Sequence, residues 1–307
     1  MRCRLMEHLL PCALAWGALA CTSTYAQCPP EGWPKAELLR LKADNWKLPD
    51  ASQRQTFSLA LLPCLGDPDP SLRDGIAFEA LSSLLRGKQL TPATQLTIYQ
   101  SQWDQLQPTA KDPAGFAKPF AALVLSELAR ADRITPFLSV DQRSKLVDAG
   151  TLYLRSTSDY RGFAAGEGWR HAVAHGADLM LQLALNPAID AGQLERILLA
   201  VQAQVAPAGE HFYVYGEGDR LARPVLYAAR RGLLGADFWA RYVATLASPV
   251  PLLPTWEDAF SSQAGLARLH NVKAFLRALD AGVRASGDAT MQATFETALP
   301  LALKGLP

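Results

Sequence analysis

Helix-forming signals recur along almost the whole chain, and they limit its fold more than any other feature. Leucine and alanine supply most of the apolar positions, and runs of β-branched residues are scarce, a composition that favours helices over strands. Asp69-Pro70 and Thr91-Pro92 each set a capping residue before a proline, which is the pattern of a helix start. These signals predict an all-α protein of about a dozen helices joined by short connections.

The predicted helices are expected to stack as a helical repeat. Consecutive helices joined by short turns pack as antiparallel pairs, and residues 67–85 resemble the opening of a HEAT-type repeat. No clean sequence period emerges, so the predicted fold is an irregular helical repeat, either a HEAT-like solenoid or an α/α superhelix, with a concave binding surface. Only His211–Tyr215 reads as a strand, and it is too short to form a sheet by itself.

The size and charge of the chain limit the number of domains and the kinds of partner that we expect. With 307 residues and 49% hydrophobic content, the chain can bury a large core, and no low-complexity linker divides it. We therefore expect residues 27–307 to form a single all-α domain. The formal net charge is +1 and no basic run occurs, so a nucleic-acid partner is not expected.

Residues 1–26 read as a signal peptide. Arg2 and Arg4 precede the apolar segment Leu9–Ala20, which has the length of a signal-peptide core and is too short to span a bilayer. Small residues follow, and Ala26 ends a reasonable cleavage site. Cleavage there would leave an exported, periplasmic chain without a transmembrane segment.

Two alternatives to this interpretation stay open. Cleavage before Cys21 would make the chain a lipoprotein anchored at that cysteine, although Ala18 stands where leucine is usual in such signals. The segment could also be a buried N-terminal helix of a cytosolic protein.

Removal of the signal peptide would leave two cysteines, Cys28 and Cys64. Two cysteines in an exported protein are candidates for a disulfide. Such a bond would tie the mature N-terminus to the second predicted helix. The alternative is a pair of unpaired thiols, with Cys64 buried.

An ionisable stripe on one predicted helix is the strongest candidate for a functional site. A helix over residues 167–185 would place His171 and His175 beside Asp178, because residues three or four apart share a helix face. Glu167 would join the same stripe, and the opposite side of this helix is apolar.

Five residues outside the stripe complete the candidate binding site, namely Asp159, Arg161, Trp169, Glu217 and Arg220. Arg161 can pair bidentately with a carboxylate of a ligand or of the protein, and the acid at Glu217 also suits a helix N-terminus. The histidine stripe itself has two alternative readings, a buried polar network or a solvated helix face.

A divalent metal is the one cofactor that the sequence suggests. His171 and His175 are four residues apart, so both imidazoles can face one metal ion. A zincin protease is excluded, because Ala172 stands where that motif needs its glutamate. A third ligand would have to come from elsewhere, and spacing selects none of Glu217, Asp219, His211 and His270.

Three motifs resemble the bacterial family catalogued as domain of unknown function 2785. They are Asp-Tyr-Arg-Gly at 159–162, Trp-x-His with Ala-His-Gly-Ala-Asp at 169–178, and Glu-x-x-Arg-Leu-Ala at 217–222. The likeness runs from about Trp33 to the C-terminus. It implies an all-helical, repeat-like fold and no particular reaction, and this chain departs from cytosolic relatives by its export signal.

Two functions fit these observations. The first is a periplasmic binding or scaffold protein that holds a ligand or a protein partner on a concave helical surface around His171 and His175. The alternative is a hydrolase or lyase in which one histidine acts as the base, oriented by Asp159 or Asp178 and assisted by a bound metal.

Overall fold

A computed structural model describes residues 28–307, and helices follow one another along this whole part of the chain. The predicted signal peptide and the alternative anchor at Cys21 lie outside the described residues. The elements in chain order are α1 (Lys35–Ala43), α2 (Ala51–Ala60), η1 (Leu62–Gly66), α3 (Pro70–Leu72), η2 (Arg73–Phe78), α4 (Glu79–Arg86), α5 (Pro92–Leu106), α6 (Ala117–Ile134), α7 (Val140–Ser156), β1 (Phe163–Ala164), β2 (Gly168–Trp169), α8 (Ala172–Ala184), α9 (Ala191–Val205), α10 (Glu217–Arg230), α11 (Ala236–Ala247), η3 (Glu257–Ser261), α12 (Gln263–Ser286), α13 (Ala289–Phe295) and α14 (Ala298–Lys304).

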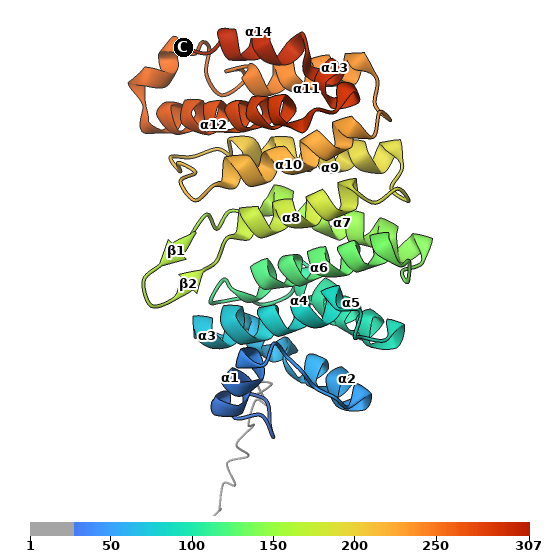
Figure 1. Cartoon of the computed structure of the whole chain (residues 1–307). Coiled ribbons are helices and arrows are strands. Elements are labelled where there is room, and N and C mark those ends of the chain that lie inside the picture. The colour runs from blue at the N-terminus through green and yellow to red at the C-terminus, as the bar shows by residue number, and fades with distance from the viewer. Residues whose placement is uncertain (1–27) are drawn as a thin grey trace, which may run out of the picture.

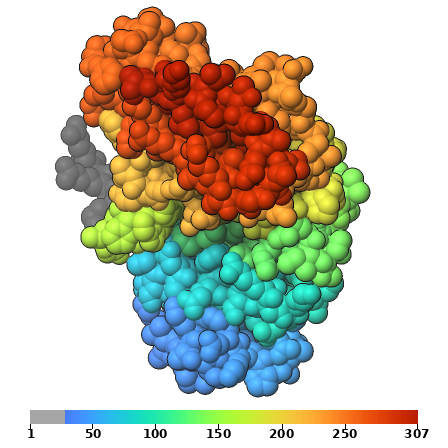
Figure 2. Space-filling model, turned by 45° about the horizontal axis from the view of Figure 1, so that its top comes forward, coloured from blue at the N-terminus to red at the C-terminus, as the bar shows by residue number. Residues whose placement is uncertain are grey.

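The helices form two stacked rows. In one row α4, α6, α8, α10 and α12 each pack on the next, and in the other α2, α5, α7, α9 and α11 do the same. Figure 1 shows these layers following one another from the N-terminal to the C-terminal end, and Figure 2 shows the same order on the surface. The all-α prediction is confirmed. The stacking is what a helical repeat would produce, while the choice between a HEAT-like solenoid and an α/α superhelix stays a prediction.

The predicted helix starts are satisfied by local hydrogen bonds. The side chain of Asp69 accepts from the backbone N–H of Ser71, and Thr91 accepts from Thr94 N–H. These bonds use backbone donors that have no partner within the first turn of a helix. Behind them, one cluster of buried hydrophobic side chains runs from Leu38 to Ala302.

The helix predicted over residues 167–185 starts later than expected. It begins as α8 at Ala172, because Gly168 (φ 74°) and His171 (φ 54°) adopt left-handed backbone conformations. In place of the first predicted turn, β1 and β2 pair antiparallel as a short hairpin. Glu167 therefore leaves the predicted stripe and lies in the hairpin turn.

The predicted strand at His211–Tyr215 is also wrong, since these residues have no regular secondary structure. Their backbone is held instead by α12, where Asn271 accepts from Tyr213 N–H at 2.8 Å and donates to the carbonyl of His211 at 3.0 Å. A side-chain amide thus bonds the backbone groups that a partner strand would otherwise have to satisfy.

Three long connections gather at one edge of the stack, and we call residues 157–171, 206–216 and 248–262 the loop edge. The guanidinium of Arg268 donates to the carbonyls of Ala206 and Ser248, which joins two of these connections. Tyr215 contacts the ring of Trp169, which joins the third. In Figure 1 they lie on the left, around the hairpin.

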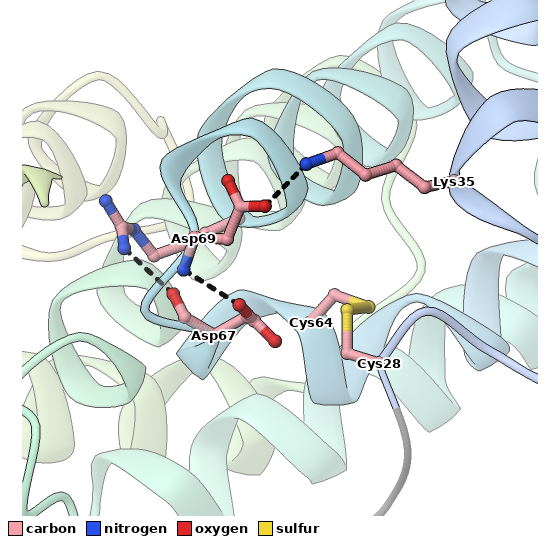
Figure 3. The surroundings of a disulfide bond; sticks show 6 residues. Cys28, Lys35, Cys64, Asp67 and Asp69 are labelled. Atoms are coloured by element: carbon pink, nitrogen blue, oxygen red, sulfur yellow. Dashed lines mark hydrogen bonds and ion pairs between the residues drawn. A yellow bond between two sulfur atoms is a disulfide. The ribbon is translucent and has the colours of Figure 1, made fainter. Parts of the chain in front are cut away.

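The N-terminal end is closed by a disulfide between Cys28 and Cys64. Figure 3 shows this bond beside the ion pair of Lys35 with Asp69, which links α1 to the start of α3. Both contacts hold the first described residues against the following helices. Among the helices of residues 28–307, none combines the length and the apolar character needed to cross a membrane.

Removal of this disulfide should destabilise the protein. The two cysteines are 36 residues apart, and freeing a loop of that length costs about 3–4 kcal/mol in the chain-entropy model. We expect urea titrations to show that the free energy of unfolding of the double variant Cys28→Ser, Cys64→Ala is lower than that of the wild type by this amount. Reductant should lower the stability of the wild type and leave the double variant unchanged. Equal stability of the two proteins without reductant would contradict the bond.

Candidate functional site

A fully buried arginine holds the hairpin of the loop edge in place. Arg73, at the start of η2, is 0% exposed. Its guanidinium donates to the carbonyl of Glu167 at 2.7 Å and to the carbonyl of Asp67 at 2.8 Å, and it forms an ion pair with Asp74 at 2.7 Å. Burial is the main cause that lowers the pKa of Arg73. Arg73 therefore links the N-terminal helices to a hairpin more than ninety residues later in the chain.

Phe116 gives this buried cation an aromatic partner. The guanidinium carbons of Arg73 and Arg170 lie 3.9 Å and 4.1 Å from the centre of its ring. Arg170 also pairs with the carboxylate of Glu167 at 2.7 Å, so Arg73 and Arg170 together hold the backbone and the side chain of this turn residue. Cation–π contacts of this kind are strongest where the cation is removed from water. The hairpin is thus a fixed part of the protein.

Gly168 shows how closely this hairpin approaches Arg73. A Cβ atom at Gly168 would lie 2.8 Å from Pro70 Cβ and 3.1 Å from Arg73 Nη2, and its φ of 74° already favours glycine. A side chain there would push the strand away from the arginine that holds it.

Four rings lie on the hairpin and beside it, and we call Phe163, Trp169, His171 and Tyr215 the aromatic platform. His171 stacks on Trp169 with ring centres 4.1 Å apart, and Phe163 lies 5.2 Å from Trp169. Tyr215 meets the Trp169 ring edge-on at 5.7 Å. Phe163 is 51% exposed, and Trp169 and Tyr215 are each 37% exposed, so the platform presents aromatic surface to solvent.

A second glycine makes room for the platform. A Cβ atom at Gly162 would come within 2.0 Å of the Tyr215 ring. Only a residue without a side chain lets Tyr215 lie across the strand that leads into the hairpin.

The two histidines occupy different environments. His171 is the residue before α8 and is partly exposed, whereas His175 is buried one turn later. Their ring centres lie 5.8 Å apart. Burial, helped by the nearby positive charge of Arg220, lowers the pKa of His171 to about 4. Burial and neighbouring His171 lower the pKa of His175 to about 3. Both imidazoles are therefore neutral at neutral pH.

The tautomer of His175 follows from its neighbour. Its Nδ1 lies 3.2 Å from the carbonyl oxygen of Pro119, and because a carbonyl can only accept, Nδ1 carries the proton. Nε2 is then left with a lone pair. The edge of the Phe120 ring packs against this imidazole at 5.2 Å between ring centres.

The predicted acids are paired with arginines. Asp159 accepts from Arg161 through both oxygens, with Nε to Oδ1 at 2.8 Å, and this bonding lowers the pKa of Asp159. Asp178 forms an ion pair with Arg220, while burial raises the pKa of Asp178. Arg161 thus pairs within its own segment, whereas the pair of Asp178 with Arg220 joins α8 to α10. In residues 28–307 no carboxylate accepts a hydrogen bond from His171 or His175.

Glu217 takes a position apart from the two histidines of the stripe. It is 3% exposed, and its carboxylate accepts from the backbone N–H of Tyr215 at 2.8 Å. Its charge raises the pKa of His211, which burial lowers more strongly. Glu217 therefore fixes the backbone of Tyr215, which is part of the aromatic platform.

The two histidines do not fit the predicted metal site. Over the described part of the chain, no three histidine, cysteine, aspartate or glutamate side chains are grouped so that they could hold a metal ion. Nδ1 of His175 donates to the carbonyl of Pro119, so Nε2 is the one nitrogen of this ring that could bind a metal, and the missing third ligand decides against the site. We therefore derive no step through a metal.

The family of the chain is settled by a match to one family model. Residues 104–280 match the model described as "Protein of unknown function (DUF2785)". The chain belongs to the DUF2785 family. The match is shorter than the likeness expected from about Trp33 to the C-terminus, but it contains all three motifs. A search of curated proteins and a search of solved structures found no significant match.

The three DUF2785 motifs meet at the loop edge. The first supplies the Asp159–Arg161 pair and Gly162, the second supplies Trp169 and both histidines, and the third supplies Glu217 and Arg220. The structure thus brings the predicted residues into one region, although they form a platform, a buried histidine and two ion pairs instead of one stripe.

Sequence reasoning missed the residues that support this region. Arg73, Phe116 and Tyr215 lie outside the three motifs, Arg170 is the variable position of the second motif, and the roles of all four depend on contacts with distant residues. One signal was present. Arg73 shares a helix face with the apolar residues Ile76 and Ala80, where an unpaired cation is not expected.

Replacement of Arg73 should loosen the hairpin selectively. We expect Arg73→Met to lose about 3 kcal/mol of stability, because it leaves Asp74 and the accepting carbonyls without their buried partner. Backbone amides of residues 163–169 should exchange with deuterium at least about tenfold faster, an effect of local opening.

Arg143→Met is the matched control for that experiment. Arg143 is also largely buried and pairs with Asp132 at 2.7 Å, far along α6 from the hairpin. It should lower stability without a selective effect on residues 163–169. Equal acceleration of exchange there in both variants would show that Arg73 does not hold the hairpin.

The buried histidine should make stability depend on pH. The pKa of His175 is about 3 in the folded protein against 6.5 for an unperturbed histidine, so the unfolded chain takes up the proton first as pH falls. Stability is therefore lost as pH falls from about 6.5 towards 3, with a limiting slope of about 1.4 kcal/mol per pH unit. Urea titrations at pH 7 and pH 5 should show a smaller loss for His175→Gln, whose amide can still donate to Pro119. Equal losses in both proteins would contradict this pKa.

Proposed function

We propose that this chain is an exported binding or scaffold protein and that its partner docks on the loop edge, at the aromatic platform. The distribution of exposed apolar side chains carries the proposal. Of the fourteen large hydrophobic residues of 28–307 that are exposed, seven lie in the three connections of the loop edge. These are Phe163, Trp169, Val214, Tyr215, Val250, Leu252 and Phe260.

This concentration is more than scattered surface apolarity would give. The loop edge holds about one-seventh of the described residues, yet half of the exposed large hydrophobic side chains. Single exposed apolar residues need no explanation, whereas a group of them on one face is typical of an interaction site.

The residue types at the platform also favour binding. Tryptophan, tyrosine and arginine contribute most often to the affinity of protein interfaces, and the platform contains Trp169 and Tyr215. The half-exposed Arg161 and Arg220 lie near its histidine, since the Arg161 carbonyl accepts from His171 N–H and the charge of Arg220 lowers the pKa of His171. The platform is rigid because Arg73 and Gly168 hold the hairpin, so little conformational entropy would be lost on binding. His175 lies beneath the platform, and the partner would contact Trp169 and His171.

The alternative is a hydrolase or lyase that uses one histidine as a base. It is supported by the neutral state of both imidazoles and by the free lone pair on Nε2 of His175. It lacks an orienting carboxylate among residues 28–307, since Asp159 and Asp178 are paired with arginines. The depressed histidine pKa values have a simpler cause in burial, and the binding function is therefore preferred.

Site-specific photo-crosslinking in the producing cell tests the binding function. A benzophenone side chain would replace Val214 at the loop edge (65% exposed) or, as a matched site, Leu301 on α14 (64% exposed). We expect a discrete adduct from position 214 and none from position 301. The double variant Trp169→Ala, Tyr215→Ala should reduce that adduct at least about fivefold, because interface aromatic residues often contribute more than 1 kcal/mol each.

The controls separate binding from folding and from export. Leu199→Ala, on the exposed side of α9, should leave the adduct unchanged, and circular dichroism should show that the double variant is folded. The same adducts from both positions, or none from either, would refute docking on the loop edge. A mature mass that begins at Gln27 supports export, a lipid on Cys21 supports the lipoprotein alternative, and an intact N-terminus contradicts both.

A further inference from the structure

One cavity lies beside Asp159 and Ala172 near the loop edge, and a second cavity lies at the far end of α6. It has a volume of about 300 Å³ and is formed by the ends of α4 and α6, the start of α5 and the turn after α6. Its apolar wall consists of Leu85, Leu90, Pro92, Ala131, Ile134, Pro136 and Phe137. Leu85 and Leu90 are buried at its base, whereas Ile134 is 45% exposed. The cavity therefore offers an apolar interior with an open side, at the small end of the size range for ligand pockets.

Three cations and no acid line this cavity. Arg86, Lys88 and Arg130 are the charged residues of its wall. Arg86 is neutralised by the buried carboxylate of Glu127, to which its Nε donates at 2.9 Å. Lys88 and Arg130 form no ion pair and no side-chain hydrogen bond with any residue of 28–307. Two positive charges at an apolar cavity are thus left without a partner.

The backbone at Lys88 marks this side chain as unusual. Lys88 follows the C-terminal end of α4 with a φ of 54°, in the left-handed region. That position after a helix is normally glycine, because a side chain there is strained. A lysine in this place is costly for the fold, and Lys88 is one of the residues that line the cavity.

The ends of α4 and α6 supply one competing explanation. Cations near a helix C-terminus are favourable because the helix dipole is negative there, and this accounts in part for Arg86, which lies in the last turn of α4. It does not account for Lys88, since glycine would relieve the strain and a dipole contact at an exposed site is weak. Nor does it explain why these cations line an apolar cavity.

We propose that this cavity binds a small anionic amphiphile, whose apolar body enters between α4, α5 and α6 and whose carboxylate or phosphate head contacts Lys88 and Arg130. The apolar interior stabilises the body by removing it from water. The two free cations make charge-assisted hydrogen bonds to the head. This site is separate from the loop edge and does not depend on the partner proposed there.

Calorimetric titration of the full mature chain with octanoate, octyl phosphate and octanol tests the site. We expect one molecule of octanoate or octyl phosphate to bind per chain at least about tenfold more tightly than octanol, which lacks the charge. The preferred head group then distinguishes a carboxylate from a phosphate ligand. Arg130→Gln should weaken the binding of the preferred anion about tenfold.

Lys88→Gly gives the sharpest result, because it should change stability and binding in opposite directions. Removal of the strained side chain should raise the melting temperature, while loss of the ammonium group should weaken anion binding about tenfold. Asn45→Gly is the matched control, since Asn45 also has a φ of 53° after a helix and lies away from the cavity. It should leave binding unchanged, as should Arg241→Gln, which removes an exposed charge on α11.

Two results would overturn the proposal. One is failure of both anions to bind more tightly than octanol. The other is anion binding that is equally strong in Lys88→Gly, Arg130→Gln and the control variants, which would place the anion elsewhere on the surface.

Discussion

The geometry of the candidate site depends on one buried cation. Arg73 belongs to the N-terminal helices, yet its guanidinium donates to the backbone of the hairpin and lies over Phe116 at the start of α6. A buried guanidinium is tolerable only when its donors and its charge are matched, and here carbonyls, an aromatic ring and Asp74 supply that match. A short hairpin with two residues in each strand is not stable alone. The arginine makes it a rigid support, and the aromatic platform can therefore keep its shape at the surface.

The two histidines at this edge differ in their exposure to solvent, and that difference decides which function is preferred. His171 stacks under Trp169 at the surface, while His175 lies one turn deeper with its proton directed at a backbone carbonyl. The acids that would be needed to orient these imidazoles are held by arginines. What remains accessible is aromatic and apolar surface flanked by charge, which suits recognition better than proton transfer.

Helix α6 connects the two regions to which we assign binding. It begins beside Phe116 under the hairpin and ends at Ile134 in the wall of the second cavity. The family match over residues 104–280 contains the loop edge and Arg130 but not Lys88 or the end of α4. The loop edge thus lies wholly within the region that defines the family, whereas the cavity is completed by the helices before it.

The sequence by itself determined the elements whose cause is local. Leucine and alanine spacing and the capping residues Asp69 and Thr91 predicted the helices, because each signal acts within one or two turns. The pairing of Cys28 with Cys64, which the structure forms, followed from counting the cysteines of the mature chain.

Only the tertiary structure decided where the helix of the two histidines begins and what its side chains meet. Arg73 and Phe116 hold the hairpin from distant parts of the chain, and a glycine or histidine in the left-handed region cannot be foreseen from periodicity. The pairing of Asp178 with Arg220, the burial of His175 and the place of Tyr215 across Gly162 are likewise contacts between segments far apart in sequence. Local signals carry no information about such partners, because the energy of these contacts exists only when the helices have stacked.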